Sequence, residues 1–341
     1  MTSETEMRKL EHIKICCEES VQSDKTTLLE FVELKKSAPL LPESDLDLSV
    51  ELFGKKLNYP LIISGMTGGA AETGKINKNL AQAAEELGIG FGVGSQRAML
   101  EDPSLKSTYD VRDVAPNVLL IGNIGAPQLS EYSSSAIEKM AMDIGSDVLA
   151  VHLNSAQEMI QPEGIVPKMD YSEKVSELCS SVSIPVILKE TGTGISQKNA
   201  NSFRNSGLSG IDVGGAGGTS FARVELERMK SPALMDFEDF GTPTAASILD
   251  VRKVFPTLPV IATGGIRTGD DVAKAIALGA NSAGIALPLL KPAQASSDAV
   301  KSYLQRVISE LKKSMMALSA PRISDLNREK IFITGELIKW L

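Results

Sequence analysis

A glycine-rich stretch late in the chain combines groups that suit a phosphate. A short apolar run, residues 259–262, precedes Gly264, Gly265 and Arg267, and a helical pattern begins near Gly269. Such a run is typical of a buried parallel strand. Glycines at its end let the backbone approach a ligand, and the following amides and guanidinium suit a phosphate dianion. We therefore predict a phosphate site after strand seven of a (β/α)8 barrel, where barrels customarily bind phosphate.

A second glycine cluster, residues 214–219, and Lys189 fit the same ligand. Taken alone, the cluster predicts a tight turn as readily as a binding loop, but paired with Gly264 and Gly265 it favours phosphate. Lys189 ends an apolar run, where a charge is costly without an anion. Two partners stay open for it: the N1–C2=O edge of a reduced flavin, or Glu190 on the barrel rim.

The densest polar group lies in the middle of the chain, at His152, Asn154, Gln157 and Glu158. The period of two along a strand places His152 and Asn154 on one face. Together these residues offer a donor, two amides and one carboxylate, which suits a diphosphate held through Mg²⁺. For His152 alone, the competing interpretation is a hydrogen-bonded core histidine.

The chain begins with a second basic group, Arg8, Lys9 and His12. On a helix, Arg8 and His12 share a face with Lys9 beside them. A solvated patch on a mobile terminus is the usual interpretation of such a group. Because the chain has 2 histidines, and both lie beside basic or amide groups, we favour anion binding.

Alternating strands and helices must position these residues. Apolar runs that predict strands occupy residues 61–64, 90–93, 119–123, 148–153, 185–189, 210–213, 259–262 and 282–287. Helical patterns occupy residues 2–19, 73–87, 133–144, 171–181, 196–206, 244–254, 268–278 and 296–318. This alternation predicts a parallel sheet, and eight strands favour a closed α/β barrel over a doubly wound open sheet.

The predicted division is an N-terminal extension or lid (residues 1–60), the barrel (61–320) and a C-terminal tail that packs on it (321–341). Residues 20–60 are expected to be extended, and residues 224–242 form an insertion after strand six.

Composition narrows the class of protein. The 341 residues are 43% apolar with a net charge of −8, which disfavours nucleic acid and anionic membranes as partners. No apolar run is long enough to span a bilayer, and the N-terminus lacks a signal-peptide core. Three cysteines, Cys16, Cys17 and Cys179, have no metal-binding spacing. We expect free thiols in a cytoplasmic protein.

Seven motifs in order resemble one family. They are Arg8-Lys9-x-x-His12, Met66-Thr-Gly-Gly69, Gly94-Ser-Gln-Arg97, His152-Leu-Asn-x-x-Gln-Glu158, Lys189-Glu190, Gly217-Gly-Thr-Ser220 and Gly264-Gly-Ile-Arg-Thr-Gly269. Along nearly its whole length the chain resembles the type 2, flavin-dependent isopentenyl diphosphate isomerases. The resemblance implies FMN, Mg²⁺, NADPH as reductant, a small diphosphate substrate and a homo-oligomer, tetramer or octamer.

The resemblance also implies roles for individual residues. FMN would contact Met66, Thr67, Gly68, Ser95, Asn123, Lys189, Thr219, Gly264, Gly265, Arg267, Ala286 and Leu287. The substrate would contact Arg8, Lys9, His12, Ser95, Gln96, Arg97, Asn154 and Gln157. Gln157, His152 and Glu225 would be catalytic, and Glu158 would hold Mg²⁺. Two aromatic positions depart from the family, because Phe221 and Phe240 stand where tryptophan is usual.

The implied reaction interconverts isopentenyl and dimethylallyl diphosphate without net redox change, in isoprenoid biosynthesis. It adds a proton at one alkene carbon and removes one from an allylic carbon. We hypothesise that reduced FMN is the acid–base and that residues 1–20 cover the site against water.

Three other functions fit the sequence less well. A 2-hydroxy-acid oxidoreductase needs a histidine late in the barrel, and none follows His152. A nucleotide dehydrogenase needs a cysteine in loop 214–220, which has none. An inactive flavin scaffold would not need the diphosphate-binding residues.

Overall fold

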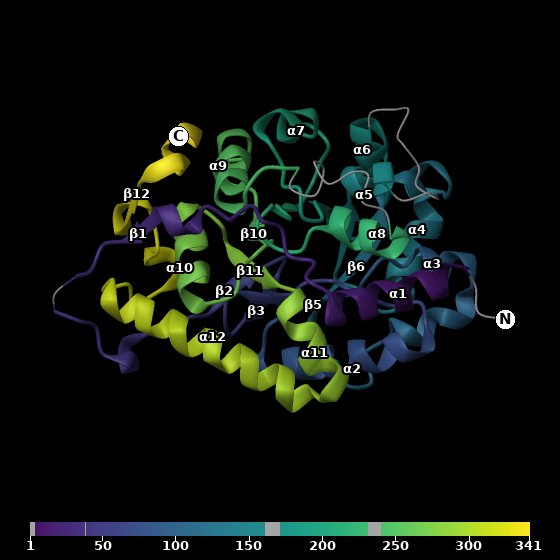
Figure 1. Cartoon of the computed structure of the whole chain (residues 1–341), viewed down its shortest axis with the longest axis horizontal. Helices are drawn as coiled ribbons and strands as arrows, with labels where there is room; N and C mark the ends of the chain where they lie inside the picture. Colours follow the sequence, from purple (N-terminus) through teal and green to yellow (C-terminus); the bar gives the residue numbers. More distant parts are fainter. Residues whose placement is uncertain (1–3, 38, 161–170, 231–239) are drawn as a thin grey trace.

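Eight parallel strands close into a barrel in the described part of the chain (Figure 1). This computed structural model describes residues 4–37, 39–160, 171–230 and 240–341. The barrel strands are β4 (Leu61–Ile63), β5 (Gly90–Gly92), β6 (Leu119–Gly125), β7 (Val148–His152), β8 (Val186–Lys189), β9 (Gly210–Asp212), β10 (Val260–Ala262) and β11 (Ser282–Ile285). The pairing of β11 with β4, for example Ala283 with Leu61, closes the sheet. The predicted (β/α)8 barrel is confirmed, and the open sheet is excluded.

Helices follow the strands as predicted. They are α2 (Ala71–Leu87), α4 (Ser134–Asp143), α6 (Tyr171–Ser181), α7 (Gln197–Ser202), α9 (Thr244–Val254), α10 (Gly269–Leu278) and α12 (Ser297–Ala317). Helix α7 ends before the predicted residue 206, because its last turn tightens when the Phe203 N–H donates to the Ala200 carbonyl. Helix α10 begins where it does because Thr268 and Asp271 form a capping box.

Four further helices lie at the C-terminal ends of alternate barrel strands. They are α3 (Arg97–Glu101), α5 (Ser155–Ile160), α8 (Phe221–Met229) and α11 (Leu287–Ala295). The last of these corrects the eighth predicted strand, which ends at Ile285. Helix α8 occupies the start of the predicted insertion, whose residues 231–239 lie outside the described part of the chain.

The N-terminal helix forms as predicted, and residues 20–60 are more structured than the extended chain that we expected. Helix α1 (Glu4–Glu18) lies over the barrel mouth, where its residues line a cavity. Farther along, β1 (Val32–Leu34) pairs with β12 (Ile331–Ile333), so that part of the N-terminal extension lies beside a segment near the C-terminus. A hairpin, β2 (Val50–Leu52) and β3 (Lys55–Leu57), completes the region. The 3₁₀ helices are η1 (Leu29–Phe31), η2 (Glu43–Asp45), η3 (Pro103–Thr108), η4 (Ala126–Ser130), η6 (Ile323–Asp325), η7 (Arg328–Lys330) and η8 (Gly335–Trp340).

Apolar side chains fill the N-terminal end of the barrel. Leu52 and Leu57 of the hairpin pack against inward-facing residues such as Ile62, Ile121 and Ile187 in one buried cluster. Because this end is filled, a ligand site must lie at the other end, where parallel barrels customarily carry their chemistry. The division at residues 60 and 320 stays a prediction.

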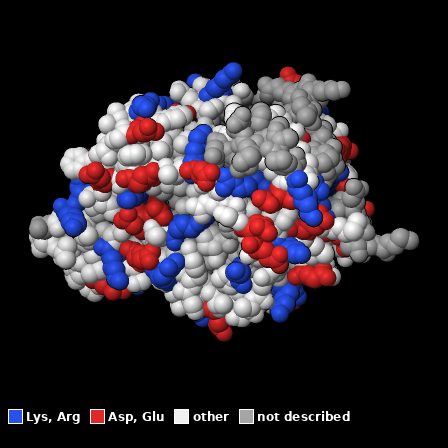
Figure 2. Space-filling model, viewed as in Figure 1, with Lys and Arg blue, Asp and Glu red and all other residues white. Residues whose placement is uncertain are grey.

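Charges are dispersed over the face seen in Figure 2. Acidic and basic side chains alternate there, and the described residues of this face show no large patch of one sign. Among the described helices, none combines the length and the apolar character needed to cross a bilayer.

Candidate active site

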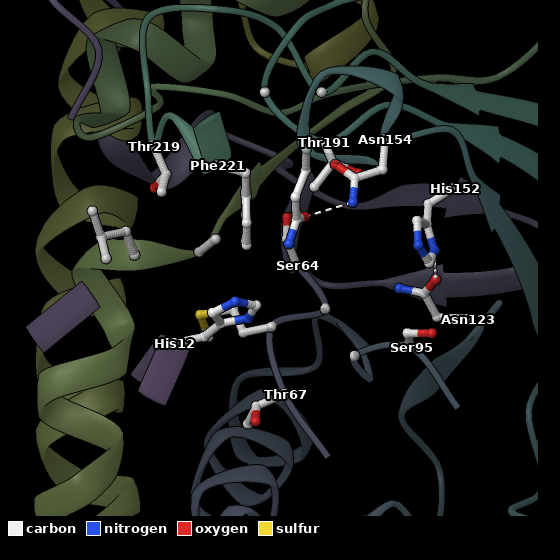
Figure 3. Close-up of a pocket in the computed structure, with 18 of the residues that line it drawn as sticks. His12, Ser64, Thr67, Ser95, Asn123, His152, Asn154, Thr191, Thr219 and Phe221 are labelled. Carbon is white, nitrogen blue, oxygen red and sulfur yellow. Dashed lines mark hydrogen bonds between the residues drawn. The ribbon is translucent and has the colours of Figure 1, made fainter. Parts of the chain in front are cut away.

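A cavity of about 260 Å³ opens at the C-terminal end of the barrel (Figure 3). Figure 3 shows His12 and Phe221 on one side of it and His152 and Asn123 on the other. Most residues predicted for the site line it, namely Arg8, Lys9, His12, Met66, Thr67, Ser95, Arg97, Asn123, His152, Asn154, Gln157, Glu158, Lys189, Thr219, Gly264, Gly265, Arg267, Ala286 and Leu287. Gly68, Gln96 and Glu225 do not. The fold therefore brings residues from the whole chain to one cavity.

Two glycine loops pack backbone against backbone at one wall. We call residues 214–219 and 264–267 the glycine cradle. Gly264 has a φ of 97°, and a Cβ there would lie 2.0 Å from the Gly215 carbonyl oxygen. A Cβ on Gly218 would lie 2.4 Å from the Gly265 nitrogen. Such contacts exclude any side chain at these positions. The N–H groups of Thr219 and Gly265 have no hydrogen-bond partner in the described part of the chain, which leaves them available to an anion.

Arg267 completes the glycine cradle with a positive charge. Its guanidinium donates to the Ile266 carbonyl at 3.0 Å, and the described residues give it no carboxylate partner. Burial lowers the pKa of Arg267, so its charge is partly desolvated. The side chain therefore favours an external anion, and the groups fit the phosphate of FMN.

Lys189 faces an aspartate on the neighbouring strand β9. Its Nζ lies 3.4 Å from Asp212 Oδ2 and donates to the Glu190 carbonyl oxygen at 2.7 Å. The Glu190 carboxylate instead accepts from the Thr191 and Thr193 N–H groups. The carboxylate that pairs with Lys189 is thus that of Asp212, and the alternative of a pair with the Glu190 side chain is wrong.

His152 is held by an amide at the cavity wall. Its Nδ1 lies 2.7 Å from Asn123 Oδ1. Asn123 Nδ2 donates to the Val93 carbonyl at 3.1 Å, so its Oδ1 must accept and His152 Nδ1 must carry the proton. Burial, with the nearby charge of Lys189, lowers the pKa of His152 to about 4. The imidazole is therefore neutral near pH 7, and a bound anion would raise its pKa.

Gln96 holds the backbone of Asn123, the residue that contacts His152. It is fully buried and does not line the cavity. Its Oε1 accepts from the Asn123 N–H at 2.9 Å, and its Nε2 donates to the Met140 carbonyl at 3.3 Å. The geometry corrects the predicted substrate contact of this side chain, because one end of its amide holds β6 and the other holds α4.

Five side chains form what we call the amide–carboxylate network: His12, Asn154, Gln157, Glu225 and Arg228. Asn154 Nδ2 donates to Gln157 Oε1, and Gln157 Nε2 donates to Glu225 Oε1, both at 2.5 Å. Arg228 Nε donates to Glu225 Oε2 at 2.7 Å. His12 Nε2 lies 2.9 Å from Glu225 Oε1, but it is poorly aligned for a hydrogen bond.

Glu225 is the charged centre of the amide–carboxylate network. The side chain is 0% exposed, so burial opposes its ionisation. The contacts with His12, Gln157 and Arg228 outweigh that cost and lower the pKa of Glu225 to about 2. Glu225 is therefore an ionised carboxylate behind the cavity wall, and Gln157 lies between it and the cavity.

Several cavity residues were missed by the site prediction. Ser64 Oγ and Thr191 Oγ1 are buried without a hydrogen-bond partner among the described residues, and both side chains line the cavity. Thr263 also lines it. The available signal was their position, since all three follow the end of a barrel strand. Of the two aromatic residues expected at the site, Phe221 lines the cavity, whereas Phe240 is 60% exposed and does not.

A metal would find few protein ligands here. The described residues contain no group of three or more histidine, cysteine or acidic side chains able to hold a metal ion. Glu158 lines the cavity and offers one carboxylate. This fits a cation held mainly by oxygens of a ligand and by water, as is usual for Mg²⁺.

Comparison with known proteins agrees with this geometry. A model of the FMN-dependent dehydrogenase family matches residues 123–333. Isopentenyl-diphosphate delta-isomerase of Archaeoglobus fulgidus is 44% identical over 99% of this chain and 98% of its own length. The enzyme of that name from Methanosarcina barkeri is 44% identical over 100% of this chain and 95% of its own.

Solved structures share the fold at lower identity. A flavocytochrome b2 mutant with benzoylformate has a TM-score of 0.72 at 16% identity, covering 95% of this chain and 82% of its own. A mandelate oxidase mutant with an FMN adduct has a TM-score of 0.63 at 17% identity, covering 97% and 93%. At this identity, the structural matches show a shared fold and nothing more. The near full-length relatives go further, and the chain belongs to the isopentenyl-diphosphate delta-isomerase family, built on the barrel of the FMN-dependent dehydrogenases.

Proposed function

We propose that this protein interconverts isopentenyl diphosphate and dimethylallyl diphosphate in isoprenoid biosynthesis. The observation that carries the proposal is that one cavity joins the glycine cradle, whose groups suit a phosphate, to the amide–carboxylate network. A simple flavin holder would need only the first of these.

The residues present fit FMN. The Thr219 and Gly265 N–H groups and Arg267 would hold its phosphate. Lys189 and the unpartnered hydroxyls of Ser64 and Thr191 would meet its polar atoms. The predicted contacts of Met66, Thr67, Gly68, Ser95, Asn123, Ala286 and Leu287 belong to the same proposal. When bound and reduced, FMN supplies an electron-rich ring with an exchangeable proton.

The substrate would bind opposite, through its diphosphate. Arg8, Arg97 and His152 line the cavity and would hold the diphosphate, and Glu158 would complete the coordination of Mg²⁺. Binding the diphosphate orients the small alkyl tail, which has few polar features of its own.

The amide–carboxylate network would act on the alkyl tail. Asn154 and Glu225 hold both ends of the Gln157 amide, so this amide has one orientation toward the cavity. The buried negative charge of Glu225 favours positive charge that develops on a tertiary carbon nearby. Phe221 supplies an apolar wall, and its ring meets His12 edge-on at a centroid distance of 6.4 Å. The wall would exclude water from a cationic centre.

Three finer points belong to the same proposal. NADPH is the expected reductant and a homo-oligomer the expected assembly, on the strength of the family resemblance. Three free cysteines support a reducing, cytoplasmic location.

The decisive experiment is the assay. FMN-loaded protein, reduced with dithionite, should convert isopentenyl diphosphate to dimethylallyl diphosphate when Mg²⁺ is present. Oxidised protein is the control, and a 2-hydroxy acid with an electron acceptor tests the oxidoreductase alternative. Oxidation of the hydroxy acid without any isomerisation would reject the proposal. Glu158→Gln should raise the Mg²⁺ concentration needed for half-maximal rate at least tenfold.

A further inference from the structure

Asp212 is a buried carboxylate to which the site prediction gave no role. It ends β9, and its side chain is 8% exposed. It does not line the ligand cavity, so it is not itself in contact with a ligand. Instead, Asp212 and Lys189 both line a separate void of about 20 Å³, which lies between that cavity and the apolar cluster in the barrel. A space of this size holds about one water, which leaves the two charges poorly screened.

The two oxygens of this carboxylate contact groups at the ends of three neighbouring strands. Oδ2 lies 3.4 Å from Lys189 Nζ, at the end of β8. Oδ1 accepts from the Gly214 N–H at 3.2 Å, just after β9, and from the hydroxyl of Thr263, just after β10. Gly214 is the first residue of one loop of the glycine cradle, and Thr263 directly precedes the other loop. One carboxylate thus connects Lys189 to both loops of the cradle.

Lys189 depends on this carboxylate when no ligand is bound. Its side chain is 12% exposed, and a buried ammonium without a counter-charge is strongly unfavourable. The neighbouring Glu190 carboxylate does not supply that charge, because it accepts from the N–H groups of Thr191 and Thr193. Asp212 therefore provides the negative charge that allows an ammonium to be kept in the barrel before a cofactor arrives.

We propose that Asp212 is a positioning residue for FMN, which holds the Lys189 ammonium in a fixed place relative to the glycine cradle and balances its charge while the flavin is absent or oxidised. This inference rests on the FMN binding of the proposed function, but not on the isomerase reaction.

Reduction of the flavin changes the balance of charge at this pair. The flavin takes up two electrons and one proton, and the reduced form carries a negative charge at its N1–C2=O edge, the partner predicted for Lys189. That charge is attracted by the Lys189 ammonium and repelled by the Asp212 carboxylate. Asp212 should therefore lower the affinity for reduced FMN relative to oxidised FMN, whereas Lys189 should raise it.

The first test measures the two-electron reduction potential of the FMN-loaded protein at pH 7. Asp212→Asn keeps the shape of the side chain but removes its charge. The preference for reduced over oxidised FMN should rise at least tenfold, which corresponds to a potential higher by about 30 mV. Lys189→Met should change the preference at least tenfold in the opposite direction. A purely structural role of Asp212 would leave the potential unchanged, and that result would overturn the proposal.

Asp250→Asn is the matched control for this measurement. The Asp250 side chain is also 8% exposed and lies 4.0 Å from Lys253 Nζ, but it does not line the ligand cavity or the void beneath it. Its replacement should leave the potential at the value of the unmodified protein. An equal rise in Asp250→Asn would also count against the proposal, because the effect would not depend on the place of Asp212.

The second test needs no flavin, and it is a double-mutant cycle on the unfolding equilibrium constant of the apoprotein. Asp212→Asn leaves the Lys189 ammonium without its counter-charge, so the constant should rise at least tenfold. Adding Lys189→Met should reverse most of that rise, because no buried charge is then unpaired. If Asp212→Asn does not fold, a folded double variant shows the same recovery. Two effects that multiply, or a double variant that also fails to fold, would reject the pairing.

The outcomes for Asp212 and for the proposed function can be distinguished. Shifted potentials in a protein that does not isomerise isopentenyl diphosphate would reject the proposed function and support the role of Asp212. Isomerisation by the unmodified protein, together with an unchanged potential in Asp212→Asn, would lead to the opposite conclusion.

Discussion

The glycine cradle and the amide–carboxylate network lie at the same barrel mouth but are built differently. The cradle consists mainly of backbone from the ends of β9 and β10, so its shape depends on what is missing, namely Cβ atoms. The network consists of side chains from α1, α5 and α8 and the end of β7, so its function depends on single oxygen and nitrogen atoms. The first should therefore be sensitive to added volume, and the second to changes of charge or of one atom.

The largest expected effect is in the glycine cradle. In Gly264→Ala, the added Cβ would lie 2.0 Å from the Gly215 carbonyl oxygen, and the φ of 97° is unfavourable for alanine. Backbone cannot yield as a flexible side chain does, so we expect a loss of FMN retention of more than 100-fold and a free energy of unfolding lower by about 4 kcal/mol. The measurements are flavin content after gel filtration and urea unfolding.

Gly74→Ala is the matched control for that substitution. Gly74 lies within α2, and its Cβ would meet Thr108 at an ordinary 3.4 Å. Alanine favours helix over glycine, so this variant should gain about 0.5–1 kcal/mol and retain FMN. A similar loss in both variants would show that the cradle has no special sensitivity to volume.

The next largest effect is expected in the amide–carboxylate network. Glu225→Gln keeps the shape of the network but removes its charge, which ends the ion pair with Arg228, whose side chain is 16% exposed. Breaking a buried pair costs about 3 kcal/mol, and turnover should fall at least 100-fold. FMN content should stay normal, because the cradle is not involved. Full turnover in reduced, FMN-loaded Glu225→Gln would contradict the role of the charge.

His152 should make the free energy of unfolding depend on pH, independently of the glycine cradle and of the amide–carboxylate network. The pKa of His152 is about 4 in the folded protein against an ordinary 6.5, so the unfolded chain binds more protons between these values. The folded protein should lose up to about 3 kcal/mol from this group as pH falls from 6.5 to 4. In His152→Gln that loss is absent. Urea unfolding at pH 7 and pH 4.5 measures this loss. Between these pH values the free energy of unfolding should fall further for the unmodified protein than for His152→Gln, and equal losses would refute the lowered pKa.

The smallest expected effect is again in the glycine cradle. Arg267→Met removes a charge but keeps a long side chain and leaves the loop backbone intact. One charge-assisted contact is worth about 2 kcal/mol, which corresponds to roughly 30-fold weaker FMN binding. Fluorescence titration of FMN measures it, with stability as the control. A loss as large as that of Gly264→Ala would mean that the guanidinium, and not the backbone, dominates phosphate binding.

The periodic features of this chain could be predicted without a structure. Each of the eight apolar runs coincides with one barrel strand, although β6 continues two residues past its run, to Gly125, and the cradle glycines lie where a strand must end. These predictions succeed because burial on both faces and positive φ are requirements of the local backbone. The boundaries were less secure, as α7 and the run that ends at Ile285 show, because capping and tight turns decide them.

Side-chain partners depended on tertiary structure. Nothing local distinguishes Asp212 from Glu190 as the partner of Lys189, and the answer follows from β8 and β9 being neighbours in the barrel. Likewise, Gln96 follows the same strand as Ser95, yet its side chain contacts Asn123 and does not line the cavity. The sequence by itself determined which segments form strands and which strand ends carry polar and glycine residues, since both follow from periodicity and backbone freedom. Only closure of the barrel decided which polar atoms meet, because hydrogen bonds between distant segments depend on distances that no local pattern encodes.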